Sequence, residues 1–440
     1  MNMKKISVLF TTLGVCILAT LSCTKSENII GGEWEPDDDQ EIVNLVKEPK
    51  PVVLTSEQRI FANDNNRFTL NFLKTVSKAD VSGKSFIYSP LSITYVLGMV
   101  NDAAVGDTEQ ELEQTLGFHQ GGIKAVNEYC KNLIDNLPLA DAGVTLNIAN
   151  AIFLNKNYTL KEQFQQDMKK YYDAKAEAMD FLSPSTLSTI NGWCNQKTKG
   201  MIPKILDEVK PDFVSYLLNA IYFKADWTTK FNPKNTQDED FTTARGTKKL
   251  PMMHQNVEIM YVKNDTFAAV TIPYGNGLWS MAVMLPEEGK TTDDVIDLLA
   301  AKGWSADETA DPMAEAREYE VDLKLPRYET ASDTEDITDG LKGLLQKMGI
   351  RLAFDSYFAQ IPNMCEVPVY ISLMRQKAKI KVNEEGSEAA AVTVAGMNKC
   401  TSVGPMEPRR AVFHANRPFV YVIREASSGV ILFVGKFTGE

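Results

Sequence analysis

His and Cys, the side chains considered first for nucleophilic catalysis and zinc binding, are few in this chain of 440 residues. Its three His are His119, His254 and His414, and it has six Cys. His414 follows Cys400 by fourteen residues, which would permit a Cys–His pair in a hydrolase, but both stand in loop or loop-edge sequence without a Gly-rich segment for an oxyanion hole. The Cys show neither CxxC spacing nor a companion His cluster, so we expect no metal site and no cofactor.

A stretch rich in small residues is a second candidate functional segment. It consists of Glu384, Glu385, Gly386, Ser387, Glu388, Ala389, Ala390, Ala391, Val392 and Thr393. Flexible linkers favour Gly and Ser, whereas Val and Thr favour a strand and Ala tolerates one. With a period of two, Ser387, Ala389, Ala391 and Thr393 share a small, uncharged face that could be buried, and Glu388 lies on the opposite face. The segment therefore suits two states, an exposed loop and a strand inserted in a sheet.

The elements that would position this segment are helices early in the chain and strands late, which predicts an α+β fold. Ser89 before Pro90 is expected to cap a buried helix, and Thr108 with Glu111 to form the capping box of the next helix. Apolar runs predict strands over 146–154, 214–223, 250–285 with a turn at Gly275-Asn276-Gly277, 321–325 and 369–382, and a hairpin over 419–434. Cys130, Cys194 and Cys365 are expected to be buried free thiols.

The N-terminus has the pattern of an export signal. Lys4 and Lys5 precede an apolar run over 6–21 that is too short for a membrane-spanning helix. Leu21-Ser22-Cys23 resembles a bacterial lipobox, in which the Cys carries lipid; without lipidation, an ordinary cleavage site would lie nearby. We therefore expect a lipoprotein-type signal peptide over 1–22, lipid on Cys23, an acidic tether over 23–55, and export to the bacterial envelope, anchored in the outer membrane and facing the periplasm or the surface.

Seven motifs, in order along residues 59–437, resemble those of the serpins. They are SPLSITYVLGM (89–99), NDAAVGDT (101–108), NAIYFKADW (219–227), LPMM (250–253), PYGNGLWSMAVMLP (273–286), NEEGSEAAAVT (383–393) and ANRPFVYVIRE (415–425). The resemblance implies a serpin domain over 56–440, with three β-sheets, eight or nine helices and an exposed reactive-centre loop. It makes the segment from Glu384 to Thr393 the hinge of that loop.

The resemblance also implies a function, the irreversible inhibition of serine endopeptidases, with cysteine endopeptidases as a second target class. The protease would form an acyl-enzyme with the loop, and the cleaved hinge would then insert into the main sheet and trap the covalent complex. Counting sixteen residues from Glu384 places the cut at Cys400–Thr401, which suits elastase-like pockets. A loop one residue shorter places it at Lys399–Cys400, which suits trypsin-like pockets.

The resemblance also implies a polar cluster that, in serpins, controls the parting of the main sheet; its positions are matched by Ser89, Ser92, Asn219 and Gln376. Trp227 matches the serpin aromatic residue where insertion begins. Gln376 stands where a His often completes the cluster, so pH sensing at that position is lost. A monomer is expected. The net charge of −12 argues against nucleic acid as a partner. The alternative is a non-inhibitory serpin that acts as a binding protein, but such members carry Pro, charge or bulk in the hinge, and this segment does not.

Overall fold

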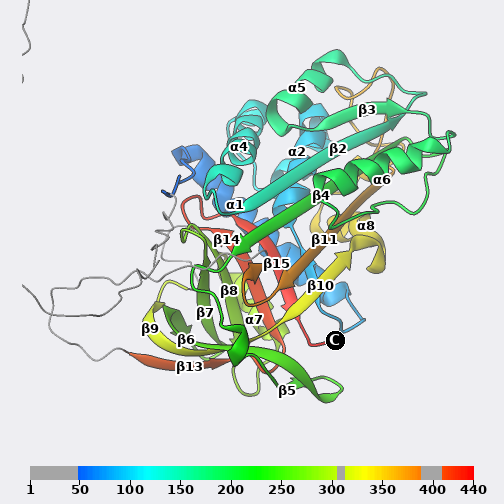
Figure 1. Ribbon diagram of the computed structural model, residues 1–440. Helices are drawn as coiled ribbons and strands as arrows, with labels where there is room; N and C mark the ends of the chain where they lie inside the picture. Colours follow the sequence, from blue (N-terminus) through cyan, green and yellow to red (C-terminus); the bar gives the residue numbers. More distant parts are fainter. Residues whose placement is uncertain (1–47, 305–312, 388–408) are drawn as a thin grey trace, which may run out of the picture. The chain divides into compact units, whose positions relative to one another are not determined.

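The computed structural model describes residues 48–304, 313–387 and 409–440 of the chain (Figure 1). Within these residues, eight α-helices and fifteen strands form, and six of the helices precede residue 200, as an α+β fold predicts. The helices are α1 (Ser56–Ala79), α2 (Pro90–Ala103), α3 (Gly106–Leu116), α4 (Gly122–Asn136), α5 (Glu162–Tyr172), α6 (Ser185–Lys197), α7 (Thr292–Lys302) and α8 (Gly340–Met348). Short 3₁₀ turns are η1 (Leu137–Leu139), η2 (Pro233–Asn235), η3 (Thr334–Asp336) and η4 (Leu352–Phe354).

A six-stranded sheet carries the segment singled out from the sequence. Its strands, in order, are β10 (Tyr328–Asp333), β11 (Leu373–Val382), β12 (Gly386–Ser387), β4 (Ser215–Asp226), β2 (Thr145–Asn155) and β3 (Lys175–Met179). Figure 1 shows α6 across one face of β2 and β4, where it buries Ile190 and Cys194 against them. The opposite face belongs to the main core, into which α2 packs.

The remaining strands form a nine-stranded sheet. Its order is β1 (Phe86–Tyr88), β15 (Ile431–Phe437), β14 (Phe419–Glu425), β8 (Trp279–Pro286), β7 (Phe267–Tyr274), β6 (Gly246–Lys263), β9 (Arg317–Pro326) and β13 (Arg410–His414), with β5 (Gln237–Thr243) also paired to β6. The expectation of three separate sheets differs from this arrangement. Strand β6 runs for 18 residues and pairs with β5 along its first part, with β9 from Met252 to Tyr261 and with β7 at its end, so the described strands form two sheets.

The helix starts near Ser89 and Thr108 correct two predictions. Pro90 is the first residue of α2 as predicted, but Ser89 makes no capping bond, because its hydroxyl donates to Leu432 O at 2.7 Å. Helix α3 begins before Thr108, at Gly106, and the Thr108 hydroxyl instead accepts the backbone N–H of Gln360 at 3.0 Å. The expected capping box is therefore absent at α3. The side chains of Ser89 and Thr108 instead make tertiary contacts, which the local sequence does not reveal.

The segment before α1 packs against the folded domain. Val52 and Leu54 are buried, and the Val52 N–H donates to Ser427 Oγ at 2.7 Å. The Lys50 N–H donates to Ala140 O at 3.1 Å. Residues 50–55, assigned to the tether from the sequence, are thus bound along the domain surface. No helix within the described ranges is both long and apolar enough to span a membrane.

Candidate functional site

The six-stranded sheet is joined at one end and parted at the other, between β4 and β11. These two strands pair in parallel from Tyr216 with Leu373 to Ala220 with Lys377. Beyond that point, residues 221–224 and 378–381 have no mutual pairing in the described part of the sheet. At the far end β12 enters the opening, and Ser387 pairs with Ala225 of β4 and with Val382 of β11. The two residues of β12 therefore stand at the mouth of a stretch over which β4 and β11 are not paired with each other.

A row of polar side chains crosses the joined end of the sheet. Asn219 on β4 stands between Asn150 on β2 and Gln376 on β11, and it is register-paired with both. The Asn219 amide donates to Asn150 Oδ1 at 2.8 Å and its own carbonyl oxygen accepts from Gln376 Nε2 at 3.2 Å. Thr334 in η3 extends the row, because its hydroxyl bonds the backbone of Gln376 at 3.1 and 3.3 Å. All four residues are buried, so each hydrogen bond is made away from water.

Gln376 also fastens the sheet to the start of α2. The Ser89 N–H donates to Gln376 Oε1 and Gln376 Nε2 donates to Ser89 O, both at 2.9 Å. The Ser89 hydroxyl lies 3.1 Å from the Ser92 hydroxyl, and both residues are buried. The structure thus brings together four of the predicted sheet-opening residues. It adds Asn150 and Thr334, which sequence reasoning missed.

Trp227 directly follows β4 at the parted end of the sheet and bonds the residues that precede β12. Its ring is fully buried and stacks on Tyr274 with the centroids 4.3 Å apart. The indole Nε1 donates to Asn383 O at 2.9 Å, and the Trp227 backbone N–H donates to Glu385 O at 2.8 Å. The Tyr274 hydroxyl lies 2.6 Å from Ser387 Oγ, and burial raises the pKa of this tyrosine, so it remains a neutral partner. Ser387 is buried on the core-facing side of the sheet.

A tight turn precedes β12. Asn383 Oδ1 accepts the N–H groups of Glu385 and Gly386 at 3.0 and 3.2 Å, and the Asn383 N–H donates to Gly386 O at 3.0 Å. Gly386 passes so close to β4 that a Cβ there would lie 2.1 Å from Ala225 O. Only glycine fits this position without a backbone shift.

Two charged contacts hold the turn from outside. Glu384 is bound by the Arg327 guanidinium, and its carboxylate also accepts the Thr236 hydroxyl at 2.6 Å. Burial would raise the pKa of Glu384, but the bonds from Arg327 and Thr236 hold it below its usual value. Glu385 pairs with Lys230 at 2.6 Å. The hinge base is therefore locked by opposite charges on both of its acidic residues.

The remaining predicted residues lie outside the described ranges. They are Glu388, Ala389, Ala390, Ala391, Val392, Thr393, Lys399, Cys400, Thr401 and Cys23. The described site thus comprises the turn, the first two residues of the strand and the sheet that would receive the rest. Such an arrangement can accept an added strand, which is a mechanical act and needs no bound ion. Among the described residues, no group of His, Cys, Asp and Glu is placed to hold a metal ion.

A family model described as serpin (serine protease inhibitor) matches residues 63–439. The chain belongs to the serpin family. Bovine (Bos taurus) Serpin B6 is 32% identical over 384 residues, which cover 85% of this chain and 97% of that protein. Human (Homo sapiens) leukocyte elastase inhibitor is 30% identical and covers 85% of this chain and 98% of its own. The solved structure of the thermophilic serpin tengpin in its native state matches with a TM-score of 0.76 at 26% identity, over 90% of this chain and 98% of that one.

Membership confirms the expected serpin fold and supports protease inhibition rather than catalysis in the usual sense. His414 bonds Asp322 at 3.1 Å, and Cys400, the other member of the alternative Cys–His pair, lies outside the described residues. Cys130, Cys194 and Cys365 are free and buried as predicted, and burial raises the pKa of the Cys130 and Cys194 thiols to about 12 each. These two thiols are therefore poor nucleophiles.

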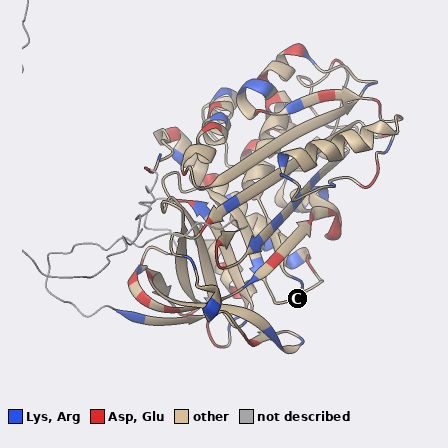
Figure 2. Cartoon of the chain, in the orientation of Figure 1, with Lys and Arg blue, Asp and Glu red and all other residues tan. Residues whose placement is uncertain are grey.

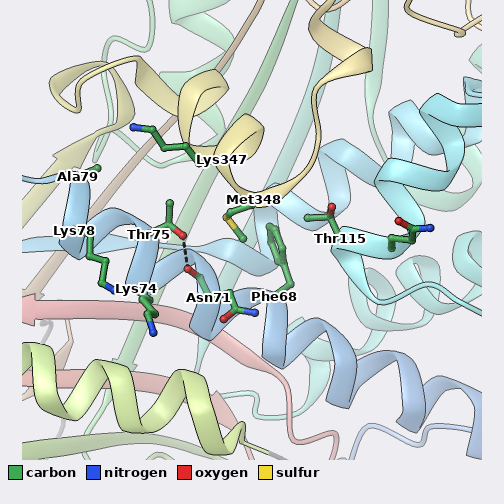
Figure 3. A pocket seen from close by; sticks show the side chains of 10 residues that line it. Phe68, Asn71, Lys74, Thr75, Lys78, Ala79, Thr115, Lys347 and Met348 are labelled. Carbon is green, nitrogen blue, oxygen red and sulfur yellow. Dashed lines mark hydrogen bonds between the residues drawn. The ribbon is translucent and has the colours of Figure 1, made fainter.

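A cavity of about 550 Å³ lies elsewhere on this serpin, between α1, α3 and α8 (Figure 3). Phe68 and Met348 form its apolar lining, and Lys74 and Lys78 stand at one side, where both contact Asp297, at 2.9 and 3.8 Å. None of the residues of the hinge or the polar row lines it. The cavity is therefore separate from the strand-accepting site.

Proposed function

We propose that this serpin is an irreversible suicide-substrate inhibitor of serine endopeptidases, with cysteine endopeptidases as a second target class. The observation that carries the proposal is the register of Ser387, which stands between β4 and β11 at the mouth of their unpaired stretch. The protease nucleophile would attack the loop carbonyl, form an acyl-enzyme and release a new amino terminus. The freed hinge would then continue β12 into the sheet and carry the acylated protease with it before water completes hydrolysis.

The pairing of β12 predicts where each hinge residue would fall. On β4, the antiparallel register sets Ala389, Ala391 and Thr393 opposite Phe223, Ile221 and Asn219. The two alanines would cover apolar positions without steric conflict, and the threonine hydroxyl would reach the polar row. Insertion would part Asn219 from Gln376, so a hydroxyl at this level would offer a replacement partner in a buried place. The order of small apolar and polar residues in the hinge thus fits the order of residues in the receiving sheet.

A matched pair of variants tests this proposal on the full chain. Purified protein is mixed with elastase and with trypsin, and complexes that survive a denaturing gel are counted. Ala391→Arg places a charge on the face to be buried and is expected to convert inhibitor into cleaved substrate. Ala390→Arg carries the same change on the opposite face and is expected to keep the complex. No covalent complex from the unaltered protein with any serine or cysteine protease tested would overturn the proposal and leave a non-inhibitory binding role.

The scissile bond would be identified from the peptide released on denaturation of the complex. We propose Cys400–Thr401, so the released peptide should begin at Thr401 with an elastase-like protease. A peptide beginning at Cys400 would assign the cut to Lys399–Cys400 and a trypsin-like target. The mass of this one peptide therefore decides the target class.

We further propose that the mature chain is a monomeric inhibitor tethered by lipid on Cys23 to the bacterial outer membrane, facing the periplasm or the surface. The support is the N-terminal pattern of Lys4, Lys5 and the apolar run before Leu21-Ser22-Cys23. Labelled fatty acid is expected to enter the unaltered protein and not Cys23→Ser. Incorporation in both would contradict the assignment, and digestion of whole cells by an added protease would report the orientation.

A further inference from the structure

Neighbouring residues of β11 face opposite sides of the six-stranded sheet at its joined end. Gln376 faces the main core, where it bonds the start of α2, and Leu373 packs against the smaller core under α6. Because side chains alternate along a strand, Arg375 faces the same way as Leu373. Arg375 is register-paired with Leu218 of β4, which belongs to that smaller core. The Arg375 side chain is only 8% exposed and always charged, so it needs acidic partners there.

Two carboxylates from different parts of the chain bind the Arg375 guanidinium. Asp333, at the end of β10, accepts a bidentate pair of bonds, from Nε to Oδ1 at 2.9 Å and from Nη2 to Oδ2. Lys377 adds a second cation 3.1 Å from Asp333. The same Nη2 of Arg375 also donates to Asp207 Oδ2 at 3.2 Å. Figure 2 shows basic positions along β11 and acidic ones on β10 beside it, whereas Asp207 comes from the loop between α6 and β4.

The loop that carries Asp207 is attached to α6 and to β4. Ile205 and Leu206 are buried in the smaller core together with Leu218 of β4. Asn191 on α6 accepts the N–H groups of Ile205 and Leu206 at 2.8 and 2.9 Å, and its amide donates to Leu206 O at 2.9 Å. Asp207 directly follows this fixed turn. Its ion pair with Arg375 therefore crosses the seam between β4 and β11 on the face opposite to the polar row.

We propose that Arg375 and Asp207 form an outer clasp that holds the joined end of the sheet shut until the hinge inserts, and that Asp333 positions the guanidinium for it. This inference rests on the proposed function. The clasp and the polar row act at the same level of the seam, because Arg375 and Gln376 are adjacent on β11. One crosses the seam on the outer face and the other on the core-facing side.

Insertion would break the clasp and leave the positioning pair intact. The register of β12 on β4 sets residue 394 opposite Leu218, so a strand that reaches this level would separate Leu218 from Arg375. Adjacent strands lie about 4.8 Å apart, so Asp207 would move with β4 away from Arg375 by about that distance. Asp333 would stay with Arg375, because β10 and β11 are paired, with Asp333 opposite Lys377. The clasp is thus a contact of the uncleaved state alone.

Asp207→Asn tests the clasp in the full chain, since it removes the charge and keeps the size. Amide hydrogen exchange of β4 from Tyr216 to Ala220 is followed in the uncleaved protein. A partly exposed ion pair stabilises only modestly, so opening of this stretch should become about 2- to 5-fold more frequent. Asp207→Glu keeps the charge and should restore most of the protection. Asp212→Asn is the matched control, because it makes the same change at another exposed position of the loop and should behave as the unaltered protein.

A second measurement separates a clasp from a merely structural contact. Thermolysin, a zinc protease that forms no acyl-enzyme, is used to cut the reactive loop in a limited digest, and melting temperatures are compared before and after the cut. Asp207→Asn should melt below the unaltered protein when uncleaved and together with it when cleaved.

Unchanged exchange of β4 in uncleaved Asp207→Asn would overturn the proposal, and so would an equal loss of melting temperature in both forms. Failure of the proposed function looks different. In that case the cut would leave the melting temperature of the unaltered protein where it was, which would refute insertion and the release that depends on it. Exchange in the uncleaved chain would still show whether the ion pair holds the seam.

Discussion

Replacing Gln376 by Met tests the polar row that joins β4 to β11. Methionine fills nearly the same volume but cannot bond, so the change isolates the hydrogen bonds. The Ser89 N–H and the Asn219 Oδ1 would each lose their buried partner, now at 2.9 and 3.2 Å, whereas Ser89 O keeps bonds from the N–H groups of Ser92 and Ile93. A buried group left without a partner costs about 1–3 kcal/mol. The free energy of unfolding should therefore fall by about 2–6 kcal/mol.

The assay is urea-induced unfolding of the uncleaved protein, followed by tryptophan fluorescence. Lys381→Met on the same strand is the matched control, because Lys381 is exposed and the change should alter stability by less than about 0.5 kcal/mol. Amide exchange at the joined end of β4, from Tyr216 to Ala220, should rise in Gln376→Met and stay unchanged in the control. If Gln376→Met lost no more stability than Lys381→Met, the row would not hold the sheet together and the reasoning would be refuted.

Three further predictions concern the hinge base. Gly386→Ala brings a Cβ to 2.1 Å from Ala225 O, so β12 should detach, seen as faster proteolysis of the hinge; unchanged proteolysis would show that the backbone shifts freely. Glu384 has a lowered pKa, so its ion pair with Arg327 is complete above the unfolded value of about 4.3 and lost as pH falls through the folded one. Hinge amide protection should accordingly drop below about pH 4.3 in the unaltered protein, and Glu384→Gln should lack this drop. Trp227→Phe removes a buried donor to the hinge turn and should lower the free energy of unfolding by about 1–3 kcal/mol in the same urea assay; a loss below about 0.5 kcal/mol would contradict it.

Local patterns were sufficient for most strands and for the side to which Ser387 points. The strand period assigned Ser387 to the face to be buried, and Ser387 is buried against Tyr274. The apolar run over 146–154 predicted β2 to within one residue at each end. Such features depend on neighbours two to four positions away, which a single sequence contains.

Contacts between distant parts of the chain were not predictable. Asn150 is a polar residue within an apolar strand, and this position was the one available signal that it has a buried polar partner. Nothing in the local sequence indicates that the partner is Asn219. Thr108 has the spacing of a capping box, yet its hydroxyl bonds a residue 252 positions away. Arg327 gives no sign of its contact with Glu384, since an exposed charge looks the same whether or not a partner folds onto it. Tertiary packing determines the partners of these side chains, and a short stretch of sequence carries no information about that packing.

The unpaired stretch between β4 and β11 also bears on the self-association of this protein at high concentration. Most sheets expose unpaired N–H and C=O groups only along an outer strand. Here residues 221–224 and 378–381 present two such borders that face each other, so a single extended peptide could be bonded on both of its sides. Under the proposed insertion, the same segment of a second molecule would bring the same small side chains to this opening. Solutions at high concentration or temperature are therefore expected to lose monomer by linking molecule to molecule through this opening.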